Sequence, residues 1–166
     1  MIAPTDQKFD QELLRQAFGC FPSGVTAFCG IVDGQPDGIA ASSFAAVSLD
    51  PALVSVCVSN NSSTWPRLAH LPRLGLSVLG GDHADVARAL ASRSGERFAS
   101  VDWHASEGGA VFVRGAPLWL ECSPYNVVRA GDHQILVLQI EALEMSPAVE
   151  PIVFHRSKLF GINRSA

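Results

Sequence analysis

The chain has 166 residues, of which 48% are hydrophobic and 17% are charged. A chain of this size can bury one sizeable core without disulfides or a structural metal, which excludes a disordered protein and favours a single domain over residues 1–166. Twelve Lys and Arg against 16 Asp and Glu give a formal charge of −4. Because no basic run occurs in the sequence, nucleic acid is not an expected partner.

The first predicted element is a helix near the N-terminus. Asp6 or Asp10 can cap it, Gly19 marks its end, and the spacing of its apolar residues is helical. The residues that share one face are Phe9, Leu13, Leu14, Ala17 and Phe18. No cationic stretch precedes an apolar run here, and no run of 18 apolar residues occurs later. We therefore expect a cytoplasmic protein that does not bind membranes.

Three strands are predicted next, over residues 24–31, 37–44 and 53–58. Asp33-Gly34 between the first two is a turn composition, which indicates a hairpin. The third run is almost continuously apolar and β-branched. We expect it at the centre of a sheet with both faces covered.

The middle of the chain contains two predicted helices separated by a strand. A short helix over residues 63–71 precedes a strand over residues 74–79. The second helix begins after Asp82, a suitable N-cap, and its apolar spacing continues to Ser94-Gly95.

The last third of the chain is predicted to be mostly strand. A loop-rich segment with a short strand at residues 110–113 comes first, and two long strands, 118–128 and 133–143, follow it with a loop over residues 129–132 between them. Two short strands, over residues 152–154 and 159–162, complete the pattern. About seven strands and about three helices, mostly connected by hairpins, favour an antiparallel barrel or sandwich carrying helices.

The cysteines match no metal or redox pattern. The chain has four cysteines, Cys20, Cys29, Cys57 and Cys122. Three of them lie in or beside apolar runs, so buried free thiols are expected. A catalytic cysteine acting with one of the five histidines is the alternative. No metal is expected, because the histidines show no ligand spacing.

The sequence lacks the common nucleotide-binding motifs. Neither G-x-G-x-x-G nor G-x-x-x-x-G-K-[ST] occurs, and H-E-x-x-H and G-x-S-x-G are also absent. Hydroxyl residues instead gather beside predicted strand ends, notably Ser62, Ser63 and Thr64 before a short helix. Free N–H groups and hydroxyls at a helix start can bind a phosphate. The alternative is that one of these residues is only an N-cap.

The segment of residues 38–54, GIAASSFAAVSLDPALV, resembles the signature of the short-chain flavin reductases, which are the reductase components of two-component flavin-dependent monooxygenases. Three further motifs keep the order of that family: Phe21-Pro22-Ser23-Gly24-Val25-Thr26, Ser62-Ser63-Thr64 and Ala130-Gly131-Asp132-His133. The resemblance covers about residues 9–162.

This resemblance implies an FMN-binding split β-barrel, usually a homodimer with the flavin near the subunit interface. The residues implied along the isoalloxazine ring and ribityl chain are Ser23, Gly24, Val25, Thr26, Ala41, Ser42, Ser43 and Phe44, with Ser48 and Asp50 lining the same groove. Those implied at the flavin phosphate are Asn60, Ser62, Ser63 and Thr64, with the pair Arg97-Phe98, or Arg93, beside them. His133 is implied as the catalytic histidine on the nicotinamide side.

The implied activity is that of an NAD(P)H:flavin oxidoreductase. Such an enzyme uses NADH or NADPH to reduce FMN or FAD and supplies the reduced flavin to a partner monooxygenase. The cofactors carry this reaction and the protein orients their rings, so no acid–base pair is required. Small residues such as Ala41 and Ser42 let the backbone approach a flat ring.

Two departures from the family pattern bear on function. Ser77 stands where many members have Asn, which leaves the choice between FMN and FAD open. Residues 154–159, FHRSKL, replace a common Tyr-Arg-Gly-x-Tyr and lack its Gly and final aromatic. The alternative function is therefore a flavin-binding carrier or auxiliary protein of the same fold without a competent nicotinamide site. A flavoenzyme that reduces its own organic substrate is a third hypothesis.

Overall fold

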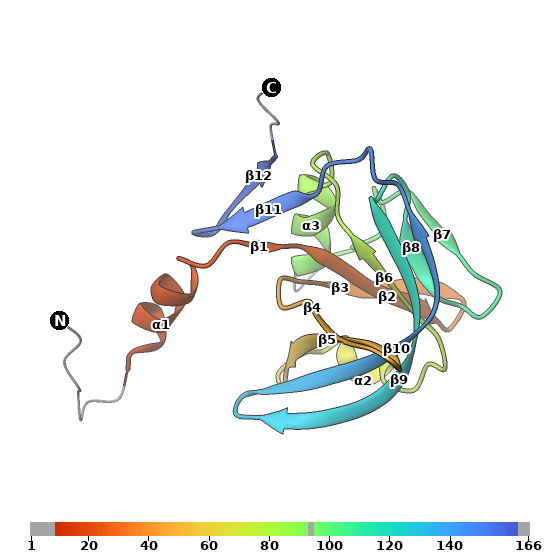
Figure 1. Ribbon diagram of the computed structural model, residues 1–166, viewed down its shortest axis with the longest axis horizontal. Helices are drawn as coiled ribbons and strands as arrows, with labels where there is room; N and C mark the ends of the chain where they lie inside the picture. Colours follow the sequence, from red (N-terminus) through yellow and green to blue (C-terminus); the bar gives the residue numbers. More distant parts are fainter. Residues whose placement is uncertain (1–8, 93–94, 163–166) are drawn as a thin grey trace.

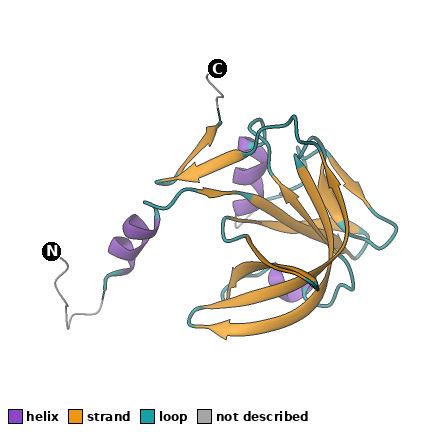
Figure 2. Cartoon of the chain, in the orientation of Figure 1, coloured by secondary structure: helices purple, strands orange, loops and turns teal. Residues whose placement is uncertain are grey.

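The computed structural model describes residues 9–92 and 95–162, and strands dominate this part of the chain (Figures 1 and 2). Its helices are α1 (Gln11–Phe18), α2 (Trp65–Leu68) and α3 (Ala84–Ala91). Its strands are β1 (Ser23–Gly24), β2 (Thr26–Val32), β3 (Gln35–Ala41), β4 (Ala45–Leu49), β5 (Ala52–Ser59), β6 (Leu74–Val78), β7 (Trp103–Ala105), β8 (Val111–Val113), β9 (Leu118–Ala130), β10 (His133–Met145), β11 (Ile152–His155) and β12 (Lys158–Gly161).

Seven of these strands form an antiparallel sheet in the order β3-β2-β6-β9-β10-β5-β4. Its two edge strands, β3 and β4, are consecutive in the chain and are joined by residues 42–44. At this junction the Ser43 hydroxyl accepts a bond from the Cys57 N–H (2.8 Å) and donates to the Cys57 carbonyl (3.2 Å). The sheet is therefore a barrel that stays open along β3, which confirms the predicted antiparallel split barrel.

Two apolar clusters lie on the two faces of β2. Phe28 points into the barrel, where it meets Trp65 and Leu68 of α2. Ala27 and Cys29 point the other way, into a cluster that includes the inner face of α3 and strands β8 and β11. Strand alternation thus places α2 and α3 against opposite faces of the same strand. Each large side chain buried in these clusters contributes roughly 2 kcal/mol.

Helix α1 confirms the predicted N-terminal helix. Asp10 is its N-cap and accepts a bond from the Glu12 N–H (3.3 Å), and Gly19 is its C-cap. Asp6, the other predicted cap, lies outside the described residues. None of the residues of α1 is buried, and Figure 1 shows the helix standing apart from the barrel. Its apolar face therefore has no partner within the described part of this chain.

The prediction for the run 53–58 was wrong in its placement. Strand β5 is second from the sheet edge, between β10 and β4, and its residues alternate between buried and half-buried. Strand β4, which covers it, was not predicted, because its apolar residues Val47 and Leu49 are exposed and give no periodic signal. Strand β7 was also missed, and the described part of the chain contains twelve strands rather than about seven.

Two turns differ from the prediction. His83 rather than Asp82 is the N-cap of α3, because the His83 N–H donates to the Gly80 carbonyl and extends the turn by one residue. Strands β9 and β10 are joined by only two residues, Gly131 and Asp132, because pairing continues further than the apolar pattern indicates. Gly131 has a φ of +62°, which such a tight turn requires.

The two predicted helices in the middle of the chain are present, but both are shorter than predicted. Helix α2 has four residues, and α3 ends at Ala91, before the predicted end. Ser94 and Arg93 lie outside the described residues. The short pieces are nevertheless anchored, because Leu68 and Leu90 are almost fully buried.

The His83 ring predicts an acid-sensitive stability. Its Nδ1 accepts a bond from the Gly80 N–H (3.0 Å), and burial lowers the pKa of His83 from its ordinary 6.5. As the pH falls below about 6.5, His83 therefore takes up a proton in the unfolded chain before it does so in the folded protein. The free energy of unfolding decreases until the pH reaches the lowered pKa of His83 in the folded protein.

We expect His83→Asn to flatten the fall in Tm between about pH 7 and pH 5, because asparagine offers an acceptor to Gly80 but does not titrate. Thermal melts across this pH range measure the effect, with His70→Asn at an exposed position as the control. An unchanged slope in His83→Asn would contradict the assignment.

The backbone of the β11–β12 turn suits glycine better than the residues it contains. Arg156 and Ser157 form it with φ of +48° and +62°, a region that disfavours side chains by about 1 kcal/mol per residue. We expect Ser157→Gly to raise the free energy of unfolding by about 1 kcal/mol in urea denaturation. Ser100→Gly is the control, because that exposed residue does not have positive φ and should gain nothing. A lower stability of Ser157→Gly would refute the prediction.

Candidate functional site

A groove of about 650 Å³ runs along the open side of the barrel. The end of β3 forms one wall, β5 and the following loop form the other, and the end of α3 lies above them. Among the predicted site residues, the groove brings together Ala41, Ser42, Ser43, Ser62, Ser63, Thr64, Arg97 and His133. The side chains of the β3 wall are small, so a flat ring has access to the backbone there.

Arg97 is held rigidly at one end of this groove. Its guanidinium donates to the Thr64 hydroxyl and to the Gly38 carbonyl (3.0 Å), and only 14% of its side chain is exposed. The Ser62 hydroxyl accepts a bond from the Trp65 N–H (3.1 Å), so it also acts as a helix cap. A fixed guanidinium beside hydroxyls is suited to a phosphate.

One carboxylate, that of Asp37, serves two guanidinium groups at this end. Arg67 approaches it to 2.6 Å and Arg97 to 3.9 Å. Arg67 also donates to the Ser63 carbonyl (2.7 Å). Two arginines around one aspartate leave a net positive charge, which favours an anion at this position.

His133 lies at the other side of the groove, on the β9–β10 turn. Its Nδ1 is 2.7 Å from the Asp132 carboxylate, and the hydrogen bond with His133 lowers the pKa of Asp132 from its ordinary value. Asn60 holds this turn, because its side chain donates to the Gly131 carbonyl (3.1 Å) and its N–H to the Asp132 carbonyl (2.9 Å). Asn60 therefore supports the position of His133 and does not line the groove.

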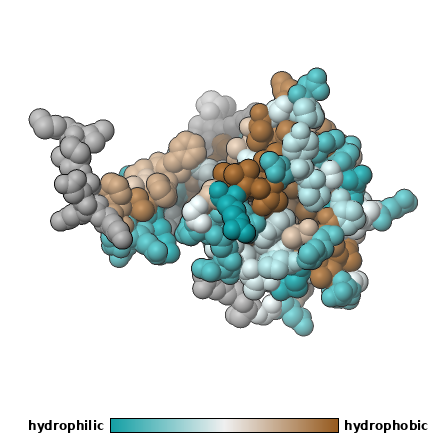
Figure 3. Space-filling model, turned by 90° about the horizontal axis from the view of Figure 1, so that it is seen from below, coloured by the Kyte–Doolittle hydropathy of each residue, from teal (hydrophilic) through white to brown (hydrophobic). Residues whose placement is uncertain are grey.

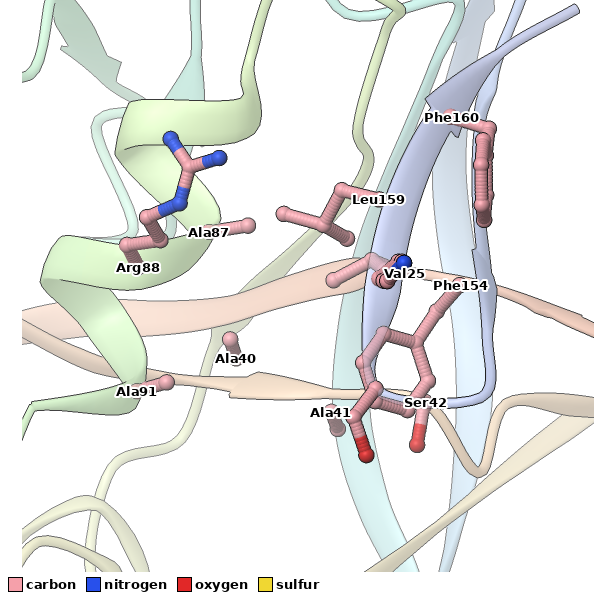
Figure 4. Close-up of a pocket in the computed structure, with 12 residues that line it drawn as sticks. Val25, Ala40, Ala41, Ser42, Ala87, Arg88, Ala91, Phe154, Leu159 and Phe160 are labelled. Carbon is pink, nitrogen blue, oxygen red and sulfur yellow. The ribbon is translucent and has the colours of Figure 1, made fainter. Parts of the chain in front are cut away.

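A second groove, of about 540 Å³, meets the first at the end of β3. Figure 4 shows α3 on one side, the β11–β12 hairpin on the other and β3 beneath, with the Phe154 ring lying towards Ala41 and Ser42. Ala41 and Ser42 line both grooves. Two flat ligands placed in these grooves would meet above these residues.

The other predicted residues lie outside the first groove. Val25 lines the second groove, and Ser23 and Gly24 pair with β11 behind it. The remaining residues belong to the barrel or its turns. The Thr26 hydroxyl donates to the Ala41 carbonyl (3.0 Å), and Phe44 packs against the barrel cluster. Phe98 packs beside α3, and Ser48 and Asp50 lie in the β4–β5 hairpin.

Three features of the site were not predicted from the sequence. Phe154 and Leu159 form a wall of the second groove; their segment was linked to nicotinamide binding, but neither residue was named as a site residue. Cys57 lines the first groove on β5. Ser77, the other departure, is fully buried, and its hydroxyl accepts a bond from the Val113 N–H (3.0 Å), so it faces neither groove.

The buried thiols are chemically inert. Burial raises the pKa of Cys122 to about 12 and raises that of Cys29 even further, so neither is a thiolate near neutral pH. Among the described residues, no three His, Cys, Asp or Glu side chains gather as metal ligands. None of the helices described is long and apolar enough to cross a membrane.

An open antiparallel barrel with two adjoining ligand-sized grooves belongs to the class of small-molecule-binding split barrels. Within this class, the profile of the flavin reductase like domain matches residues 18–163. The chain therefore belongs to the flavin reductase like domain family.

Individual relatives agree with this assignment. The chain is 32% identical over 157 residues to the reductase subunit HsaB of a flavin-dependent monooxygenase from Mycobacterium tuberculosis, covering 93% of this chain and 84% of that protein. The NADH:FAD oxidoreductase SgcE6 from Streptomyces globisporus, solved with NAD and FAD fragments, superposes with a TM-score of 0.88 at 35% identity over 95% of both chains. A probable flavin reductase of Rhizobium meliloti is 36% identical over 86% of this chain, which spans only 46% of that protein's length.

Proposed function

We propose that this chain is an NAD(P)H:flavin oxidoreductase that reduces FMN or FAD and delivers the reduced flavin to a partner monooxygenase. The meeting of the two grooves above Ala41 and Ser42 carries the proposal. Hydride transfer needs the nicotinamide and flavin rings within about 3.5 Å of each other, and adjoining grooves provide this arrangement. The similarity to HsaB, a monooxygenase reductase subunit, and to SgcE6 supports the same activity.

The residues of the first groove suit a flavin. Arg97 and Ser63 lie where they can hold its phosphate, and the small β3 residues lie where the ring needs close backbone approach. The bound flavin would supply the hydride-accepting chemistry, while the protein positions the ring and stabilises negative charge on it. His133 would do the latter from the nicotinamide side. In this proposal, further predicted residues that lie outside the first groove support it. They are Ser23, Gly24, Thr26, Phe44, Ser48, Asp50 and Phe98.

The second groove suits the nicotinamide. Phe154 and Leu159 offer it an apolar wall, and the β11–β12 hairpin that carries them is fully paired from Ile152 to Gly161. Despite its altered sequence, this hairpin therefore still forms a wall of the second groove, which adjoins the flavin groove. This observation favours a reductase over a flavin carrier without a nicotinamide site.

We further propose that the chain acts in the cytoplasm, where nicotinamide cofactors are supplied and free thiols persist. A homodimer is part of the proposal, because the segment of residues 9–18, which includes α1, and strands β9 and β10 expose large apolar side chains. These are Phe9, Leu13, Phe18, Tyr125, Val127, Val128, Leu143 and Met145. Figure 3 shows apolar surface along the projecting arm of the molecule. Apolar area of this extent is typical of subunit contacts.

The dimer proposal predicts that Phe18→Asp dissociates the chain into monomers in sedimentation equilibrium. Phe18 is 71% exposed and belongs to a helix without buried residues, so the substitution should not disturb the barrel. Leu49→Asp is the control, because Leu49 is even more exposed (97%) but lies at the β4–β5 hairpin. A monomeric wild type would refute the homodimer.

Activity is tested by following NADH and NADPH absorbance in air with no flavin, with FMN and with FAD. The proposal expects nicotinamide oxidation that depends on added flavin. Ser42→Phe, which fills the junction of the grooves, should abolish it, whereas Ser100→Phe at an exposed turn should not. Flavin binding without nicotinamide oxidation would replace the reductase by the carrier function.

A further inference from the structure

A third groove, of about 820 Å³, lies beyond the phosphate end of the flavin groove. It runs between the β2–β3 turn and residues 95–99, and it shares Ser63 and Arg97 with the flavin groove. A ligand that passes Arg97 therefore reaches it without leaving the protein surface. The activity proposed above does not use this space.

The lining of this groove combines cations with aromatic rings. At the end nearest the flavin groove, Arg67 and Arg97 flank Asp37, and this pair of cations suits a pyrophosphate better than a single phosphate. Phe98 and Trp103 line the same groove, and both are half-buried and offer flat apolar surface to a purine base.

Carboxylates lie on the same groove, and they fit a neutral group better than a further anion. Asp33 and Glu96 line it, and both can accept hydrogen bonds from the hydroxyls of a ribose. The lining thus offers cations, carboxylates and aromatic surface, which are the kinds of group that suit the pyrophosphate, the ribose and the base of an adenine dinucleotide. FMN ends at its single phosphate and would leave this groove unused.

We propose that the third groove binds the adenylate half of FAD, and that the chain therefore prefers FAD to FMN. This inference rests on the flavin site proposed above, because the groove is reached through Arg97. A dinucleotide that fills both grooves gains contacts that FMN cannot make. We expect the Kd for FAD to be about tenfold lower than that for FMN, which corresponds to about 1.4 kcal/mol.

The test measures the Kd values of FAD and FMN by titration calorimetry of the full chain. AMP at millimolar concentration should raise the apparent Kd of FAD and leave that of FMN unchanged. Ala99→Glu places a carboxylate in the groove at an exposed position and should reduce the preference for FAD to nearly one. Ala148→Glu, exposed in the loop after β10, is the matched control and should keep the wild-type preference.

The outcomes separate this proposal from the reductase function. Equal Kd values for FAD and FMN in the wild type, or an unaltered preference in Ala99→Glu, would overturn the adenylate site while flavin-dependent NADH oxidation still stands. A preference for FAD that Ala99→Glu removes, without any nicotinamide oxidation, would support the adenylate site and refute the reductase. Failure of both flavins to bind would refute both proposals.

Discussion

Replacing Arg97 by alanine is expected to weaken flavin binding by about a hundredfold, equivalent to about 2.7 kcal/mol. The Arg97 guanidinium bridges Thr64 and Gly38 and shares Asp37 with Arg67, so its position is fixed before any ligand arrives. A charge-assisted bond from a preorganised donor to a phosphate is worth up to about 3 kcal/mol. The substitution also leaves Asp37 with a single cation, which lowers the positive charge at the phosphate end.

Arg97→Lys should recover part of the affinity, because an ammonium group keeps the charge but cannot bridge Thr64 and Gly38 as a planar fork does. Arg114→Ala removes the same charge from a half-exposed side chain that lines none of the three grooves and is the control for net charge. Titration calorimetry with FMN and FAD measures each Kd, and thermal melts establish that each variant is folded. A folded Arg97→Ala variant with wild-type affinity would remove Arg97 from the phosphate site.

Replacing His133 by alanine is expected to lower the rate of flavin-dependent NADH oxidation at least tenfold, while the Kd of the flavin changes by less than about threefold. The imidazole lies at the edge of the flavin groove and away from Arg97, so it contributes little to holding the phosphate. The Asp132 carboxylate lies 2.7 Å from its Nδ1 and orients the ring. A positive charge at this position would favour the electron-rich reduced flavin.

Asp132→Asn separates the charge of this pair from its geometry. Its amide can still contact His133 but carries no negative charge, so the rate should fall less than in His133→Ala. Stopped-flow measurement of the flavin absorbance under anaerobic conditions isolates the hydride-transfer step. An unchanged rate in His133→Ala would assign His133 to the turn alone.

Strand content and hairpin order could be predicted from the sequence, because β-branched runs and turn residues are local signals. The Asp33-Gly34 turn and the long β9–β10 hairpin are examples. The position of β5 could not be predicted in this way. Its apolar run indicates burial, but the partner on its outer side, β4, has no buried face and therefore no pattern.

The candidate site could be predicted only where a family motif marked it. The motif residues at the end of β3 and after β5 do meet in one groove, although they are about 20 residues apart in the chain. Phe154 and Leu159 could not be placed, since apolar residues in a short strand look alike whether they line a core or a groove. The hydrogen bonds of the Thr26 and Ser77 hydroxyls could not be predicted either, because their partners are backbone groups of distant strands.

The order of the barrel strands has a consequence for biosynthesis. Strand β5 pairs with β10, so Ser59 meets His133 only after most of the chain has left the ribosome. The β5 wall of the flavin groove depends on this late pairing, which is a non-local contact of the kind that slows folding. Until then the β4–β5 hairpin offers an unpaired edge to other nascent chains. Flavin added during synthesis should thus find no binding site on truncated chains that lack β10, and flavin binding reports on completed translation.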